Sequence, residues 1–245
     1  MKQRLDVLLV ERGLFESRER AQRAIMAGSV RVGGRRLDKA GTKVSCEEQL
    51  EVVAAEKYVG RGGHKMEGAL AAFGIVPEGW VCLDVGASTG GFTDCLLQHG
   101  AARVYALDVG HSQLDWKIRS HPRVVVGEKI NCRYLTENEV PEPVDLLVAD
   151  VSFISLTLVL PASLRRVRAG GMAVVLIKPQ FELSRECVGR GGVVQAPALH
   201  AQAVERIRQW VAEQPDLAWR GCIESPLRGG DGNTEFLAWI GKRLD

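Results

Sequence analysis

The sequence of 245 residues lacks the features of several protein classes. Its six cysteines form no Cys-x-x-Cys pair and have no histidine at zinc spacing, so we expect buried free thiols in a reducing compartment and no metal site. No apolar run approaches the ~20 residues that span a bilayer, and the short run over 7–10 is interrupted by Glu11. We therefore expect no membrane partner, no secretory signal and a cytoplasmic location.

The overall charge also excludes a strongly basic protein, because the formal net charge is only +2. The hydrophobic fraction of 46% and the charged fraction of 25% are typical of a globular chain. Affinity for nucleic acid would therefore have to come from local clusters of basic residues.

Such a cluster lies in the first 55 residues or so. Leucines at helical spacing predict a helix that ends at Gly13, Ser17 is a candidate N-cap for a second helix that ends at Gly28, and Gly33-Gly34 predicts a hairpin turn. From the residues alone, the cluster is compatible with phosphate contacts and with a solvated surface. The candidate RNA-binding residues, all arginines, are Arg4, Arg18, Arg20, Arg23, Arg31, Arg35, Arg36 and, beyond this segment, Arg61.

The rest of the chain predicts an α/β fold. Apolar strands alternate with amphipathic helices, which is typical of a doubly wound, mostly parallel sheet covered on both faces. The expected strands are 81–84, 103–108, 123–126, 144–150 and 173–178, with 217–224 and 235–240 as an antiparallel pair at the sheet edge. We expect a small N-terminal α+β domain over 1–58, a flexible linker over 59–63 and a larger domain over 64–245.

A glycine-rich turn follows the first strand of the larger domain. It carries neither the lysine of a phosphate loop nor the glycine order of a dinucleotide site. Asp84, and Asp108 at the end of the next strand, instead suit a nucleoside with a cationic tail, as in S-adenosylmethionine. A tight turn without a ligand is the alternative. The candidate cofactor-binding residues here are Asp84, Gly86, Ala87, Ser88, Thr89, Gly90, Gly91, Phe92, Thr93 and Asp108.

Two further strands deliver chemically useful residues to the same edge of the sheet. Asp150 follows the fourth strand and Lys178 follows the fifth. Lys65 comes just after the junction and Glu235 starts the last strand, so both can fold over this edge. Each residue alone could be a surface or ion-paired group, and it is their joint placement that indicates a catalytic site.

These motifs resemble a known family. From Asp84 onward the chain is similar to the ribose 2′-O-methyltransferases of the RrmJ/FtsJ type, which have a Rossmann-like class I methyltransferase fold, and the first fifty residues resemble the RNA-binding domain of the fourth small-subunit ribosomal protein. The whole chain resembles the TlyA family of ribosomal RNA cytidine-2′-O-methyltransferases. The matching segments are 61–65, 84–93, 150–156, 178–182, 191–194 and 232–236.

The resemblance implies S-adenosylmethionine-dependent 2′-O-methylation of ribosomal RNA, with RNA or a ribosomal subunit as the partner of a monomer. The family's Lys–Asp–Lys–Glu tetrad falls on Lys65, Asp150, Lys178 and Glu235. Lys178 would activate the hydroxyl, Asp150 would orient it and face the cofactor methyl, Lys65 would steady a phosphate or the oxyanion, and Glu235 would hold the lysines. Further cofactor contacts implied are Val109, Glu128 and Asn131.

One position departs from the family pattern, because Cys132 stands where a small alanine is expected. Three alternatives remain. An exocyclic-amine methyltransferase would carry a Pro-Pro turn after the fourth strand, where this chain has Asp150-Val151-Ser152-Phe153. A membrane-active haemolysin would need an amphipathic or spanning segment. An RNA-binding regulator with an inactive cofactor fold would not need the tetrad.

Overall fold

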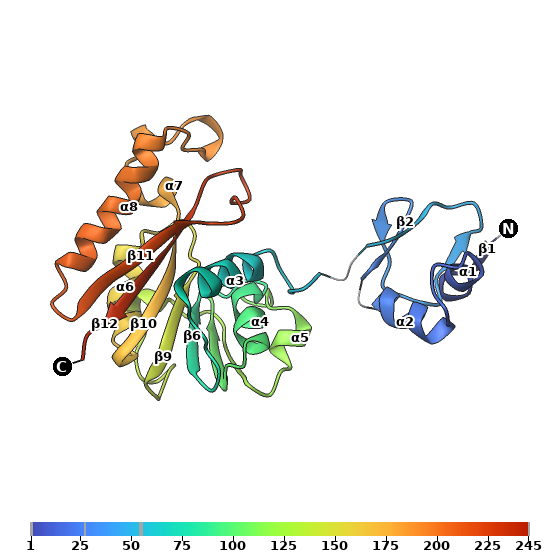
Figure 1. Ribbon diagram of the computed structural model, residues 1–245, viewed down its shortest axis with the longest axis horizontal. Helices are drawn as coiled ribbons and strands as arrows, with labels where there is room; N and C mark the ends of the chain where they lie inside the picture. Colours follow the sequence, from blue (N-terminus) through green and yellow to red (C-terminus); the bar gives the residue numbers. More distant parts are fainter. Residues whose placement is uncertain (1, 27, 54–55, 245) are drawn as a thin grey trace. The chain divides into compact units, whose positions relative to one another are not determined.

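The computed structural model describes residues 2–26, 28–53 and 56–244, and the chain divides into two compact units, residues 1–57 and 58–245 (Figure 1). No helix in these described ranges is long and apolar enough to cross a membrane.

The smaller unit is an α+β module whose core is made by two helices. Leu5, Leu9 and Ile25 are fully buried between the helices and the short strands. The predicted helices and the hairpin that turns at 33–34 are confirmed. Its elements are β1 (Lys2–Arg4), α1 (Leu5–Glu11), α2 (Arg18–Met26), β2 (Val30–Val32), β3 (Arg35–Arg36), β4 (Lys43–Ser45) and β5 (Leu50–Val52).

The larger unit contains a seven-stranded sheet in the order β11-β12-β10-β9-β6-β7-β8. The five strands from β10 to β8 are parallel, and β12 pairs antiparallel with both β10 and β11. The expected doubly wound, mostly parallel sheet with an antiparallel edge pair is therefore confirmed. The strands are β6 (Val81–Val85), β7 (Arg103–Leu107), β8 (Val124–Gly127), β9 (Val144–Ala149), β10 (Val167–Ile177), β11 (Leu217–Glu224) and β12 (Phe236–Lys242).

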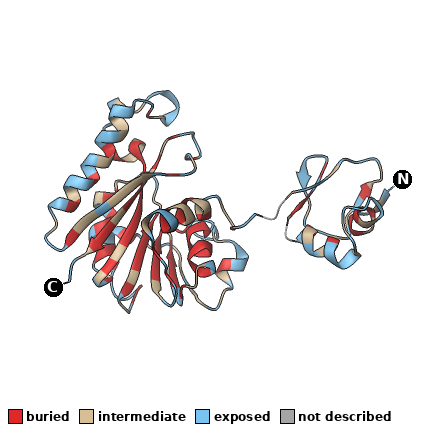
Figure 2. Cartoon of the chain, viewed as in Figure 1, coloured by how far each residue is buried: buried red, intermediate tan, exposed pale blue. Residues whose placement is uncertain are grey.

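Helices cover both faces of this sheet, which explains why its central strands are continuous apolar runs (Figure 2). One apolar cluster joins the sheet to α3, α4 and α5, and the other joins it to α6 and α8. The helical elements are α3 (Gly62–Phe73), α4 (Gly91–Gln98), α5 (Trp116–Arg119), η1 (Cys132–Tyr134), α6 (Leu156–Leu164), α7 (Pro179–Glu182), η2 (Arg185–Cys187), η3 (Arg190–Gly192) and α8 (Pro197–Ala212).

Strand order places the functional edge. The strands β7 and β8 follow on one side of β6 and β9 and β10 follow on the other, so the order in which strands are added to the sheet reverses at β6. Open α/β sheets bind ligands at such a switch point. The glycine-rich turn that follows β6 lies there.

The structure differs from the sequence prediction at the junction. Residue 58 was expected in the smaller domain and residues 59–63 in a flexible linker, but all of them belong to the larger unit. Tyr58 is buried, the Val59 N–H donates to Asp94 Oδ2 (2.9 Å), and α3 already begins at Gly62. The physical reason is that the glycines of 60–63 pack closely against Thr89 and Gly91, which are distant in the sequence and meet them only in the folded chain. The fifth strand is also longer than expected, since β10 begins at Val167 and continues through a register shift.

Candidate active site

The turn after β6 is held in a sharp conformation by backbone hydrogen bonds. The N–H groups of Gly86 and Ala87 both donate to the Leu107 carbonyl, at 2.9 and 3.1 Å. Gly86 has φ +83°, and a Cβ there would lie 2.4 Å from the Asp150 carbonyl oxygen. Ser88 adopts a left-handed conformation with φ 49°, and its N–H donates to Asp108 Oδ2 at 2.8 Å. The turn therefore requires glycine at 86 and brings three strand ends together.

Asp84 lies inside β6, one residue before its end, and is fully buried. The Thr93 hydroxyl donates to its Oδ2 at 2.6 Å, whereas Oδ1 has no hydrogen-bond partner. Burial raises the pKa of Asp84 to about 7, and the nearby Asp150 and Asp108 carboxylates add to this shift. Asp84 is therefore a buried carboxylate with one unpaired oxygen, and two neighbouring carboxylates disfavour its ionisation.

The predicted Lys178 and Asp150 meet at the ends of β10 and β9. Lys178 Nζ lies 2.6 Å from Asp150 Oδ1 and donates to Ser152 Oγ at 2.9 Å. Lys178 is only 9% exposed, so its amine is held in one place rather than moving in solvent. Ser152, which sequence reasoning did not assign, is thus a second partner of the lysine.

The other two residues of the expected tetrad form a second pair. Lys65 on α3 donates to Glu235 Oε2, just before β12, and both side chains are buried. A Cβ at Gly229 would lie 2.6 Å from Glu235 Oε1, so the loop before β12 packs tightly on this carboxylate. Substitution of either partner of such a buried ion pair would destabilise the protein, because the remaining charge would be left buried and unpaired.

A cavity of about 280 Å³ joins the pairs to the glycine turn. A second hollow of about 450 Å³ continues past Ser88 and Asp150 toward Asp108. Predicted site residues that line the first cavity are Arg61, Lys65, Gly86, Ala87, Ser88, Thr89, Gly91, Phe92, Asp150 and Lys178, and those that line the second include Asp108, Val109 and Asn131.

Other predicted residues stand behind these walls. Asp84 and Thr93 support the turn from beneath, Gly90 caps α4 with φ +94°, and Glu235 contacts the cavity through Lys65. None of these four lines the two cavities. Their roles are therefore to shape and charge the site, as far as the structure describes it.

Glu128 and Asn131 lie toward the far end of the cleft. Glu128 lines a small hollow beside Asp108, accepts the Ser112 N–H at 2.6 Å and pairs with Arg119. Asn131 caps η1 by accepting the Arg133 N–H at 3.1 Å.

The junction 60–63 forms part of the site wall, and only Arg61 of it was predicted from the sequence. A Cβ at Gly60 would lie 2.6 Å from Thr89 Oγ1, and one at Gly91 would lie 2.9 Å from the Gly63 nitrogen. The glycines at 60–63 therefore allow the start of α3 to lie directly against the cofactor turn. The available signal was the presence of three glycines in each of the two distant segments, 60–63 and 86–91.

Phe153 is a second feature missed at the sequence level. It is 91% exposed, has φ +64°, and its ring centroid lies 5.2 Å from that of Phe181. A bulky residue with positive φ is strained. It lines the larger hollow and offers an aromatic face in the same hollow as Asp150 and Ser152.

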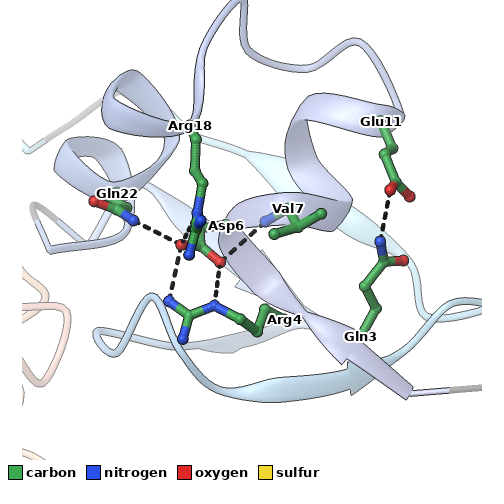
Figure 3. A network of polar contacts seen from close by, with 7 residues as sticks. All are labelled: Gln3, Arg4, Asp6, Val7, Glu11, Arg18 and Gln22. Carbon is green, nitrogen blue, oxygen red and sulfur yellow. Dashed lines mark hydrogen bonds and ion pairs between the residues drawn. The ribbon is translucent and has the colours of Figure 1, made fainter.

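In the smaller unit, two of the predicted arginines, Arg4 and Arg18, contact a buried carboxylate. Asp6 is fully buried and accepts hydrogen bonds from Arg4, Arg18 and Gln22, as Figure 3 shows. The Arg4 hydrogen bond is the main cause that holds the pKa of Asp6 far below its usual range. All the arginines predicted to bind RNA in this unit are exposed. In the described ranges, no group of three His, Cys, Asp or Glu residues could hold a metal ion.

Comparison with family models decides the classification, because the model of the FtsJ-like methyltransferases matches residues 58–242. The chain belongs to the FtsJ-like methyltransferase family. This FtsJ-like domain follows an S4 domain, whose model matches residues 3–50.

Named relatives share both parts. The chain is 47% identical to the 16S/23S rRNA (cytidine-2′-O)-methyltransferase TlyA of Mycobacterium tuberculosis, over 99% of this chain and 91% of that protein. It is 41% identical to Hemolysin A of Brachyspira hyodysenteriae, over 96% and 98%. A solved structure of a haemolysin-named protein from Streptococcus thermophilus superposes with a TM-score of 0.74 at 43% identity, over 99% of this chain and 89% of that one.

Proposed function

We propose that this protein transfers the methyl group of S-adenosylmethionine to the 2′-hydroxyl of a ribose, that of a cytidine, in ribosomal RNA. The observation that carries the proposal is the meeting of Lys178–Asp150 and Lys65–Glu235 at a cavity walled by the glycine turn. The name and 47% identity of the mycobacterial relative support the acceptor, and the S4 domain supports RNA as the partner. We infer that the protein acts in the cytoplasm, because ribosomes are assembled and work in that compartment.

The cleft suits a cationic nucleoside. The Asp84 carboxylate is buried, has one oxygen without a partner, and is repelled by Asp150 and Asp108. An ammonium or sulfonium group would relieve this repulsion, whereas a pyrophosphate would increase it. We assign the turn 86–92 and Asp108 to hold S-adenosylmethionine, which supplies a methyl group already activated by the positive charge on its sulfur.

The protein's remaining tasks are alignment and management of one proton. In its uncharged form Lys178 accepts the proton of the ribose hydroxyl, and the ammonium so formed is stabilised by Asp150 at 2.6 Å. Ser152 fixes the direction of the amine. A positioned base adds ~10²–10⁴-fold to a rate, and alignment of the reacting atoms adds more.

Lys65 provides a second positive group at the cavity. Its pairing with the buried Glu235 holds the ammonium at the wall. There it would steady the neighbouring phosphate or the negative charge that develops on the ribose oxygen. Arg61, which lines the same cavity and is exposed, would contact the RNA backbone beside it.

The test is to locate the transferred methyl group. The purified protein is incubated with methyl-tritiated S-adenosylmethionine and with bare ribosomal RNA, small subunits or large subunits, and the RNA is digested to nucleosides. We expect label in 2′-O-methylcytidine. Lys178→Ala should reduce it at least ~10²-fold while calorimetry shows unchanged cofactor affinity, and Lys129→Ala, an exposed lysine outside both cavities, serves as the control. Label on a base, or on no RNA, would overturn the proposal.

A further inference from the structure

Asp150 and Lys178 lie on two short segments that meet again a few residues farther on. The buried Glu182, at the end of α7, accepts the Leu156 N–H with Oε1 at 2.8 Å. It also accepts the Ser155 hydroxyl with Oε2 at 2.6 Å. Glu182 is 2% exposed, and both of its carboxylate oxygens accept hydrogen bonds from the start of α6.

Capping of α6 does not by itself require this carboxylate. Ser155 is already the N-cap, with its side chain accepting the Thr157 N–H. Burial raises the pKa of Glu182, and Arg206 contacts its backbone carbonyl at 2.5 Å. A buried charge is unfavourable unless hydrogen bonds compensate it, so the residue must do something that an apolar side chain would not.

What the carboxylate holds in place is the loop that carries the reactive groups. Only four residues separate Asp150 from Ser155, and among them Phe153 keeps a left-handed backbone. Such strain persists only where the surroundings fix it. Phe181, one residue before Glu182, packs on that strained phenylalanine.

Three sets of contacts join the segments 150–156 and 178–182. Lys178 contacts the first loop at one end, the two phenylalanine rings meet in the middle, and Glu182 closes the other end. Loss of the Glu182 hydrogen bonds would let the segment 150–156 move away from Lys178. Misplacement of a reacting group by about 1 Å can lower a rate ~10²-fold.

We infer that Glu182 is a positioning residue, which locks the segment 150–156 against 178–182 and so sets the distance between Lys178 and its partners Asp150 and Ser152. Glu182 lines neither cavity of the site and reaches no reacting atom itself. The inference rests on the proposed function, because the rate it controls is that of methyl transfer.

The test compares variants at this one position with a control on α8. Glu182→Ala should lower kcat ~10–100-fold, with the KM for RNA and the Kd for S-adenosylmethionine within about twofold of wild type. Glu182→Gln should restore most of kcat, since its amide can accept from Leu156 and donate to Ser155. Arg206→Ala removes the contact to the backbone carbonyl and the nearby positive charge, but it leaves both hydrogen bonds of the carboxylate in place and should keep kcat.

Hydrogen exchange gives a readout that needs no substrate. Amides in 150–158 should exchange faster in Glu182→Ala, while those in 84–98 stay as in wild type. Ser155→Ala removes one contact to Glu182 together with the N-cap hydrogen bond to the Thr157 N–H, so it is compared with Ser155→Asp, which keeps a capping acceptor but cannot donate to Glu182. Faster exchange in both variants provides the test if Glu182→Ala does not fold.

Four results would overturn the inference: wild-type kcat in Glu182→Ala, unchanged hydrogen exchange over 150–158 in that variant, no rescue by Glu182→Gln, or an equal fall in Arg206→Ala, which would assign the effect to packing of α7 on α8. If the wild-type protein leaves ribose unmethylated, the proposed function fails. The exchange experiment needs no substrate, so it still tests separately whether Glu182 holds the segment 150–156.

Discussion

Asp84→Asn should make the protein more stable and bind its cofactor less tightly. The wild-type carboxylate is fully buried, with one oxygen unpaired and a pKa of about 7 in place of 3.8. At ~1.4 kcal/mol per pKa unit, its ionisation in the folded state costs at most about 4 kcal/mol. Asparagine removes the charge and still accepts the Thr93 hydroxyl.

The sign of this effect depends on pH. Between pH 3.8 and about 7 the folded wild type holds a proton on Asp84 that the unfolded chain has lost, so wild-type stability falls as pH rises through this window. The gain of Asp84→Asn over wild type should therefore be full near pH 8 and vanish near pH 4. Urea denaturation across this range measures it.

Cofactor affinity should move in the opposite direction. A carboxylate beneath the turn attracts a cationic ligand more strongly than an amide does, by roughly 1.5–3 kcal/mol at an effective dielectric constant of ~20 and a charge separation of ~6–10 Å, or about 10–100-fold in Kd. Calorimetry at pH 8 measures the change. Asp94→Asn is the matched control, because Asp94 is buried nearby but accepts the Val59 N–H and contacts Lys117, so its loss should destabilise. No gain in stability at pH 8, or an unaltered Kd, would refute the reasoning.

Three further variants test other parts of the molecule. Gly86→Ala should destabilise by about 2–5 kcal/mol in urea denaturation, since a Cβ there meets the Asp150 carbonyl at 2.4 Å in a left-handed backbone; near-wild-type stability would contradict it. Asp6→Ala should lower the stability of the smaller unit by about 2–3 kcal/mol and weaken RNA binding in a filter assay, whereas exposed Asp38→Ala should do neither. Phe153→Gly should raise stability by up to about 1 kcal/mol by relieving strain, and weaken RNA binding by about 1–3 kcal/mol if a base stacks on this ring; unchanged RNA affinity would remove that role.

The sheet could be predicted because its information is local. Runs such as 144–149 and 173–177 are apolar and bounded by turn residues, and parallel strands present their carboxyl ends at one edge. Placement of Asp150 and Lys178 at that edge follows directly. Lys65 and Glu235 could be placed at this edge only as candidates, and their pairing was not predictable from the local sequence, since 170 positions separate them in the chain.

What could not be predicted depends on contacts between distant segments. The glycines at 60–63 have the composition of a linker, and only their approach to Gly91 shows that they form a wall. Glu182 gives no local sign that both its oxygens bind residues 26 and 27 positions earlier. The left-handed backbone of Phe153 contradicts its local preference and is imposed by the fold.

The pairing of Lys65 with Glu235 also has a consequence for biosynthesis. The lysine leaves the translating machinery early and the glutamate 170 positions later, at the start of the final strand of the sheet. A nascent chain that stops short of this strand lacks the counterion of Lys65 and has an incomplete catalytic wall. A chain cut before Glu235 would therefore keep the Lys178–Asp150 pair but would leave the buried Lys65 without its partner.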